Sequence, residues 1–281
     1  MTMGTIAWRY TFEEDIINKV SFSRLFIIRL VGENIGLLNP SNIIGGDTYK
    51  GYQLSKEGIP YHKSTSSLVL SRMIMMVTQI LTFIIAGSVF TIIVQDSNQL
   101  KWIIFGSILL LIVLTIATYG LLRFGLVSSK VHGLIAKLGW NSLIYKFRKI
   151  YVQLRCFYRD QRQRFLKAIG FNILNWLIGS LEFWLIFYFV SAQISVLDAL
   201  LVDQGVLVLK SFGAFIPGQL GIEEFSNKMM LSIVGVKAAG LWVAASIIRR
   251  SRQIFWIAVS GLLYLLIRRH RPSNVTISTI R

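Results

Sequence analysis

The sequence is poor in charged residues and in the residues that build disulfide or metal frameworks. Only 15% of its 281 residues are charged, whereas about 25% is usual in a soluble domain. Its single cysteine, Cys156, excludes an internal disulfide and a cysteine-rich metal site. The three histidines show no metal-ligand spacing or catalytic pattern, and no carboxylate cluster of the DDxxD type occurs. We therefore predict no metal, no cofactor and no enzymatic activity.

Long apolar runs are what the sequence does contain. Hydrophobic residues make up 54% of the chain, and a run of roughly 20 apolar residues can cross a hydrocarbon core about 30 Å thick as a helix. The first twenty residues lack the apolar core of a cleavable signal peptide, so later segments must direct insertion. This pattern predicts an all-α, polytopic integral membrane helical bundle. The clearest predicted spans are residues 68–95, 101–122, 168–190 and 252–267.

Positive charge is concentrated in one connection. The net charge is +17, and residues 123–167 contain eleven Lys or Arg against one acid, Asp160. Because cytoplasmic loops carry an excess of basic residues, we predict a cytoplasmic loop that attracts anionic headgroups, not a nucleic-acid site. A multi-pass membrane protein with this loop in the cytoplasm follows. The basic residues 249–252 and the basic tail favour the same side, yet one crossing segment separates them, so one cluster must be external, buried or interfacial.

The chain is predicted to form one membrane domain, residues 1–281. Its predicted parts are an N-terminal segment with a first re-entrant element (1–67), a helical hairpin (68–122), the basic loop (123–167), a second half with a second re-entrant element (168–267) and a basic tail (268–281).

The first motif is "NPSNIIGGDTYKG". Pro40 is expected to end the preceding helix, Gly45 and Gly46 to permit a tight turn, and Asp47 to cap the next helix. An ordinary loop with a helix cap fits the same residues. Polar side chains interrupt the apolar run before the motif, and such residues face a bundle interior or a water-filled cavity. They are Arg24, Arg29, Glu33 and Asn34, of which Arg29 and Glu33 are spaced to pair on one helical face.

The second motif is "PGQLGIEE". Pro217 is expected to end an arm over residues 196–216, and Gly218 and Gly221 let the backbone turn. Glu223 and Glu224 then fall in the first turn of the next helix, where the helix dipole favours negative charge. An acidic cap at the water interface explains them as well as a polar gate does. Further intramembrane candidates are Arg72, Glu182, Asp198, Asp203 and Lys210.

Both motifs place a helix break beside polar residues within an apolar region. Non-helical backbone at membrane depth requires protein or a water-filled cavity around it, and paired broken helices indicate a transporter's binding site. We therefore predict two re-entrant elements that meet near the membrane midplane, with Asp47 and Glu224 lining one common cavity.

The two motifs, in this order among apolar spans, resemble the paired signatures of the flippase-like family named after the membrane region of lysylphosphatidylglycerol synthases. The similarity runs from about Val20 to Ile267. The resemblance implies a helical membrane fold with two re-entrant regions, located in a prokaryotic plasma membrane. It also implies a role in moving modified lipids between leaflets. The residues that match motif positions are Pro40, Gly45, Gly46, Asp47, Pro217, Gly218, Gly221 and Glu224.

The sequence departs from the family pattern in three respects. Family members usually begin with two membrane helices before the first motif, so either the start lies upstream or this is a shortened member. Glu223 stands where a basic or polar residue is more usual. The soluble aminoacyltransferase domain is absent, so this chain is not expected to aminoacylate a lipid.

We predict a lipid flippase or export protein for an aminoacyl-phospholipid, glycolipid, polyprenyl or hopanoid type of lipid. Asp47 and Glu224 would contact hydroxyls or an amine or take up a proton, while Lys50, Arg72 and Lys210 would hold phosphate. The predicted translocation residues are Asn34, Asp47, Lys50, Arg72, Glu182, Lys210, Glu223 and Glu224.

The alternative is a membrane scaffold that docks a cytoplasmic lipid-modifying enzyme or glycosyltransferase through its basic loop. The arginines expected to carry that docking are Arg155, Arg159, Arg162 and Arg164. The expected partners are membrane lipids, such an enzyme and a second copy of the chain in a homo-oligomer.

Overall fold

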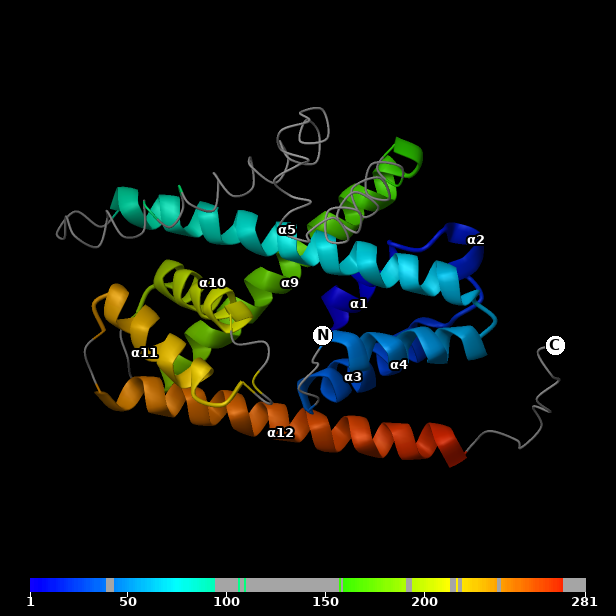
Figure 1. Ribbon diagram of the computed structural model, residues 1–281. Coiled ribbons are helices and arrows are strands. Elements are labelled where there is room, and N and C mark those ends of the chain that lie inside the picture. Colours follow the sequence, from blue (N-terminus) through cyan, green and yellow to red (C-terminus); the bar gives the residue numbers. More distant parts are fainter. Residues whose placement is uncertain are drawn as a thin grey trace, which may run out of the picture.

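In the computed structural model, all regular secondary structure among the described residues is helical (Figure 1). These are residues 1–38, 43–93, 106, 109, 157, 159–190, 194–212, 216, 219–236 and 239–269. The helices are α1 (Thr2–Arg9), α2 (Glu14–Ile17), α3 (Phe22–Leu38), α4 (Ile43–Lys56), α5 (Tyr61–Ile93), α9 (Arg162–Phe189), α10 (Val196–Phe212), α11 (Ile222–Ile233) and α12 (Ala239–Arg269).

Two long helices, α5 and α12, lie on opposite sides of the molecule, with two shorter pairs between them (Figure 1). One pair is α3 with α4, and the other is α10 with α11. Helix α5 contacts α4, α9 and α10, and α12 contacts α3, α9 and α11. Each long helix therefore touches both pairs and joins the two halves of the bundle.

Two helices in the described part of the chain are long and apolar enough to span a membrane. They are α5, over Tyr61–Phe90, and α9, over Arg162–Phe189. Large apolar side chains on both are exposed, such as Ile85 at 61% and Phe189 at 79%. A contiguous exposed apolar surface is unfavourable in water but is expected where helices face lipid. Helix α12 is as long, but arginines interrupt its middle.

Each half of the bundle has its own apolar core. Around α10, buried side chains such as Phe183 and Phe187 of α9 pack with Val202, Val206 and Leu231 of the second pair. Near the N-terminus, a separate cluster is formed by buried residues of α1 to α5. The buried members of this second cluster are Trp8, Phe12, Ile16, Ile17, Val20, Leu25, Ile28, Leu54, Ile59 and Leu68.

The structure confirms the helical character of three predicted spans and moves their limits. Residues 68–95 fall largely within α5, which begins earlier, at Tyr61, so the boundary predicted at residue 67 lies inside a helix. Residues 252–267 form only the second half of α12, because that helix starts at Ala239. The predicted span 101–122 and most of the basic loop lie outside the described residues.

The two helix–break–helix segments predicted around the motifs correspond to α3–α4 and α10–α11. Helix α10 is described to Phe212, and residues 213–215 of the arm predicted to reach residue 216 lie outside the described residues. The breaks include Pro40, Pro217 and Gly218, which lie outside the described residues. That either pair re-enters the membrane stays a prediction.

Candidate functional site

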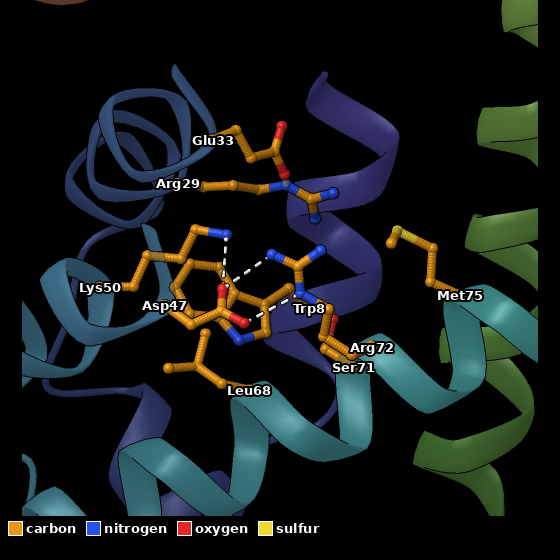
Figure 2. Close-up of a pocket in the computed structure, with 9 residues that line it drawn as sticks. All are labelled: Trp8, Arg29, Glu33, Asp47, Lys50, Leu68, Ser71, Arg72 and Met75. Atoms are coloured by element: carbon orange, nitrogen blue, oxygen red, sulfur yellow. Dashed lines mark hydrogen bonds and ion pairs between the residues drawn. The ribbon is translucent and has the colours of Figure 1, made fainter. Parts of the chain in front are cut away.

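Asp47 lies at the centre of a polar cluster between α4 and α5 (Figure 2). Its carboxylate accepts two hydrogen bonds from Arg72 of α5, Nε to Oδ2 at 2.9 Å and Nη2 to Oδ1 at 3.0 Å. The Nζ of Lys50 lies 3.2 Å from Oδ1. One carboxylate is thus shared by two cations, and the two-pronged Arg72 contact is the stronger, more directional form of such a pair.

The structure corrects the predicted roles of Asp47 and the two glycines before it. Helix α4 begins at Ile43, so Asp47 is its fifth residue and not a cap, and Gly45 and Gly46 lie in the helix and not in a tight turn. Gly46 instead permits close packing. A Cβ on Gly46 would lie 2.3 Å from the carbonyl oxygen of Gly32 on α3, so only glycine lets α3 and α4 approach this closely.

A second ion pair lies beside Asp47. Arg29 donates from Nε to Oε1 of Glu33 at 2.7 Å, which confirms the pairing predicted from their spacing. Its Nη1 also donates to the carbonyl oxygen of Gly4 in α1. Both ion pairs line a cavity of about 30 Å³. This cavity can hold a water molecule but no larger group. Trp8, Leu68, Ser71 and Met75 complete its lining.

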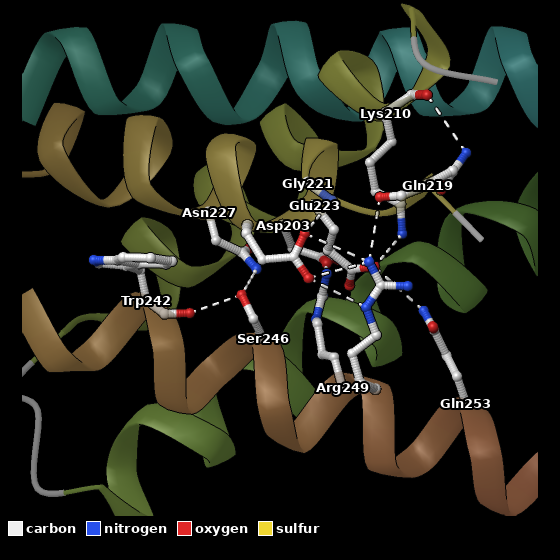
Figure 3. A network of polar contacts seen from close by, with 12 residues as sticks. Asp203, Lys210, Gln219, Gly221, Glu223, Asn227, Trp242, Ser246, Arg249 and Gln253 are labelled. Carbon is white, nitrogen blue, oxygen red and sulfur yellow. Dashed lines mark hydrogen bonds and ion pairs between the residues drawn. The ribbon is translucent and has the colours of Figure 1, made fainter. Parts of the chain in front are cut away.

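A second polar network lies between α10, α11 and α12 (Figure 3). At its centre is Glu223, whose side chain is 1% exposed. Its Oε2 accepts from Lys210 Nζ at 2.9 Å and from Gln253 Nε2 at 3.4 Å. Asp203 and Lys210 were predicted to share one face of a helix, and both belong to this network (Figure 3). Lys210 donates to Glu223, and Asp203 accepts a hydrogen bond from Arg249 of α12.

Glu224 has two partners, one local and one distant. Its Oε2 accepts from the backbone N–H of Gly221 at 2.8 Å, which satisfies a donor at the start of α11. Its Oε1 lies 3.1 Å from Nη2 of Arg250. The prediction that Glu223 and Glu224 occupy the first turn of a helix is confirmed. Gly221 precedes that turn with a φ of 81°, a left-handed conformation that favours glycine.

Three arginines of α12 each hold a carboxylate from a different helix. Arg249 pairs with Asp203 of α10 and Arg250 with Glu224 of α11. The third, Arg252, pairs with Glu182 of α9. The basic cluster 249–252 was predicted to be external, buried or interfacial if the tail is cytoplasmic. Arg249 of this cluster is buried, with 8% of its surface exposed.

Asn34 connects the two halves. Its Nδ2 donates to the carbonyl oxygen of Trp256 at 3.2 Å. This bond joins α3 to α12 on the C-terminal side of the three arginines. This residue was predicted to contact a ligand, and the structure shows a contact between helices. A backbone carbonyl oxygen has two lone pairs, so it can accept this bond in addition to its bond within the helix.

Among the described residues, Asp47 and Glu224 line different cavities and not the one common cavity predicted for them. Asp47 lines the cavity beside Arg29, whereas Glu224 lines a different pocket of about 220 Å³ against α12, with Trp242 and Arg250. The reason is the packing of each motif against its own half of the bundle. Each carboxylate is only partly exposed, Asp47 at 20% and Glu224 at 31%, and each is paired with an arginine.

The three cations predicted to hold phosphate are all found on carboxylates. Lys50 and Arg72 share Asp47, and Lys210 holds Glu223. In the described ranges, no group of three or more His, Cys, Asp or Glu side chains is placed to hold a metal ion. Residue-type patterns did not indicate Trp8, because it lies in the N-terminal segment without a recognisable motif.

Comparison with known proteins places this geometry in a family. The family described as the lysylphosphatidylglycerol synthase TM region matches residues 3–261. The chain belongs to this family. A UPF0104 membrane protein of Methanocaldococcus jannaschii is 25% identical over 186 residues, which cover 63% of the chain and 55% of that relative. The chain thus spans about half the length of the curated relative it matches. No solved structure matches it.

Membership in the lysylphosphatidylglycerol synthase TM family makes this a helical membrane protein. The match includes both polar networks and the three arginines of α12. The charged side chains described above therefore belong to a membrane region, where ionisable groups are expensive and are retained for pairing or for function.

Proposed function

We propose that this protein moves a lipid with a polar headgroup between the leaflets of its membrane. The observation that carries the proposal is the cavity lined by five charged side chains within a helical membrane protein. They are Arg29, Glu33, Asp47, Lys50 and Arg72. Five ionisable groups around one small cavity are more than helix association needs, and the family's relation to lipid synthases points to a lipid ligand.

The two polar networks would act as successive partners for the headgroup. A headgroup that enters the bundle loses its hydration, and charged side chains that exchange partners can replace it. The Asp47 and Glu224 clusters each offer a carboxylate and an arginine able to re-pair. The acyl tails would stay in the bilayer beside the exposed apolar faces of α5 and α9.

Reconstituted vesicles test this function. Fluorescently labelled lipids that carry a polar headgroup are incorporated into the vesicles. The fraction of the labelled lipid that an impermeant quencher can reach is then followed in time. The wild-type chain should accelerate exchange between leaflets over protein-free vesicles. Asp47→Asn and Glu224→Gln should each abolish the acceleration, because each removes a charge that an arginine holds.

The matched control is Glu13→Gln. Glu13 is half exposed and pairs with Lys63 at 2.7 Å outside both networks, so its loss should leave exchange unchanged. Normal exchange in both network variants, at equal protein per vesicle, would overturn the assignment of these carboxylates. No acceleration by the wild-type chain with any of the four lipid types would overturn the proposed function itself.

A further inference from the structure

We infer that the cavity between α1, α4 and α5 is a receptor for phosphate oxygens, built from Trp8, Lys50 and Arg72. This inference rests on the proposed function, since it specifies the ligand class of that site. The shared chemistry is a phosphate group, either in a lipid headgroup or free in solution. Asp47 would act as the resident counter-ion that the phosphate partly replaces.

The charges around the cavity do not balance. Arg29 and Glu33 pair with each other, but Lys50 and Arg72 must share Asp47 alone. Three cations therefore face two carboxylates among the side chains that line the cavity. A cation held away from water without its own counter-charge is unfavourable, so one added negative charge is what this cluster lacks.

The second network does not show this excess. There Lys210, Arg249 and Arg250 face Asp203, Glu223 and Glu224, three charges of each sign. Its buried atoms without partners in the described part of the chain include oxygens of Gln204, Glu223 and Asn227. That region is short of donors and would not attract an anion. The contrast locates anion binding in the first cluster.

The indole of Trp8 supplies independent support. Trp8 is 2% exposed and lines the cavity, and its Nε1–H finds no acceptor in the described part of the chain. Buried tryptophan N–H groups usually have a partner. Lys50 lines the same cavity, and its Nζ lies 5.9 Å from the centroid of the Trp8 ring. Different oxygens of one phosphate can accept from an indole N–H and from an ammonium group.

Arg72 is the residue that can admit the ligand. The present cavity of about 30 Å³ is too small for a phosphate. The Arg72 side chain is 29% exposed, whereas that of Lys50 is 6% exposed. Arg72 can therefore swing away from Asp47 and bind two phosphate oxygens, which suits its planar fork. Lys50 stays behind and neutralises Asp47.

Equilibrium binding to the purified full chain in neutral detergent tests this site. The probes are short-chain phosphatidylglycerol, inorganic phosphate and a short-chain diacylglycerol without phosphate. The variants are Trp8→Phe, which removes the N–H and keeps the ring, and Arg72→Gln. The control is Arg24→Gln, since Arg24 pairs with Glu57 at 2.8 Å in the same half but does not line the cavity.

We expect the wild type and the Arg24→Gln control to bind the phosphate-bearing lipid equally and to ignore the diacylglycerol. Trp8→Phe should weaken binding about tenfold, the usual loss for one hydrogen bond to a charged group, and Arg72→Gln should weaken it by more, because it removes two such bonds. Trp8→Phe is decisive, because a purely structural Trp8 with an unused N–H would leave affinity unchanged. Binding of inorganic phosphate with the same losses would identify the free ion as a ligand too.

Equal affinity of Trp8→Phe, Arg72→Gln and wild type would overturn the phosphate site. So would equal binding of the diacylglycerol. These results are separable from lipid exchange in vesicles. Exchange without phosphate-dependent binding would remove the site and leave the function, whereas binding without exchange would leave the site and remove the function.

Discussion

Arg249 of α12 donates to the carboxylate of Asp203 of α10, and both side chains are at least nine-tenths buried. The guanidinium also lies over the ring of Phe183, 4.3 Å from its centroid, and Asp203 accepts a further bond from Ser180 at 3.0 Å. One ion pair thus joins α9, α10 and α12 where no solvent can replace either partner.

Loss of Arg249 should strongly destabilise the bundle. Arg249→Met keeps the apolar stem but leaves Asp203 buried without its cation, which typically costs about 3–5 kcal/mol. Thermal unfolding in detergent or nanodiscs should show a clear fall in Tm. The double variant Arg249→Met with Asp203→Leu should recover much of it. The comparison variant is Arg159→Met, whose exposed pair with Asp160 should matter by less than about 1 kcal/mol. Equal effects at both arginines would contradict the buried pair.

Gly46 should not tolerate even a methyl group. Gly46→Ala places a Cβ against the backbone of Gly32, so α3 and α4 must separate, at a cost of about 1–3 kcal/mol. Gly170→Ala in α9 is the matched control, because a Cβ there meets nothing within 4 Å. It should be neutral or stabilise α9 by up to about 1 kcal/mol. Both are measured by thermal unfolding, and a loss at Gly170 equal to that at Gly46 would argue against close packing of α3 on α4.

Glu224 should contribute to stability and to transport through different atoms. Glu224→Gln keeps an acceptor for the Gly221 N–H, whereas Glu224→Ala leaves that donor without the partner seen here. We expect Glu224→Ala to unfold at a lower temperature than Glu224→Gln, by the equivalent of about 1 kcal/mol. Lipid exchange should be lost in both. Retained exchange in Glu224→Gln would reduce Glu224 to a helix cap.

Cys156 offers a direct test of membrane orientation. It is the single cysteine of the chain and belongs to the basic loop predicted to be cytoplasmic. A membrane-impermeant maleimide should label it in inverted vesicles and not in intact cells, with labelling in detergent as the reference for total reactivity. The variant Cys156→Ser controls for labelling of other groups. Modification in intact cells would reverse the proposed orientation.

Local rules predicted much of what the helices and their nearest neighbours do. The pairing of Arg29 with Glu33 follows from four-residue spacing, and the acidic first turn of α11 follows from Gly221 and the two glutamates after it. Both depend on contacts within one helix or turn. The apolar runs likewise identified α5 and α9, because length and composition suffice for a span.

Distant contacts escaped the same rules. Asp47 and Arg72 are 25 positions apart, and their pairing depends on how α4 packs against α5. The two adjacent glycines before Asp47 favoured a turn, yet Gly46 is explained by the backbone of α3 opposite it. The separation of Asp47 and Glu224 into different described cavities has the same cause. Two similar motifs do not reveal which helices each will pack against.

The unbroken course of α12, from the second polar network to its contact with Asn34 of α3, has a mechanical consequence. One stiff rod bonded to Asn34 in one half and to Asp203 and Glu224 in the other cannot shift along its axis for one half alone. Release of a carboxylate at one end would strain the bonds at the other. Helices α3 and α12 should therefore move in concert, and a substitution at Asn34 should alter the kinetics of events at the second network.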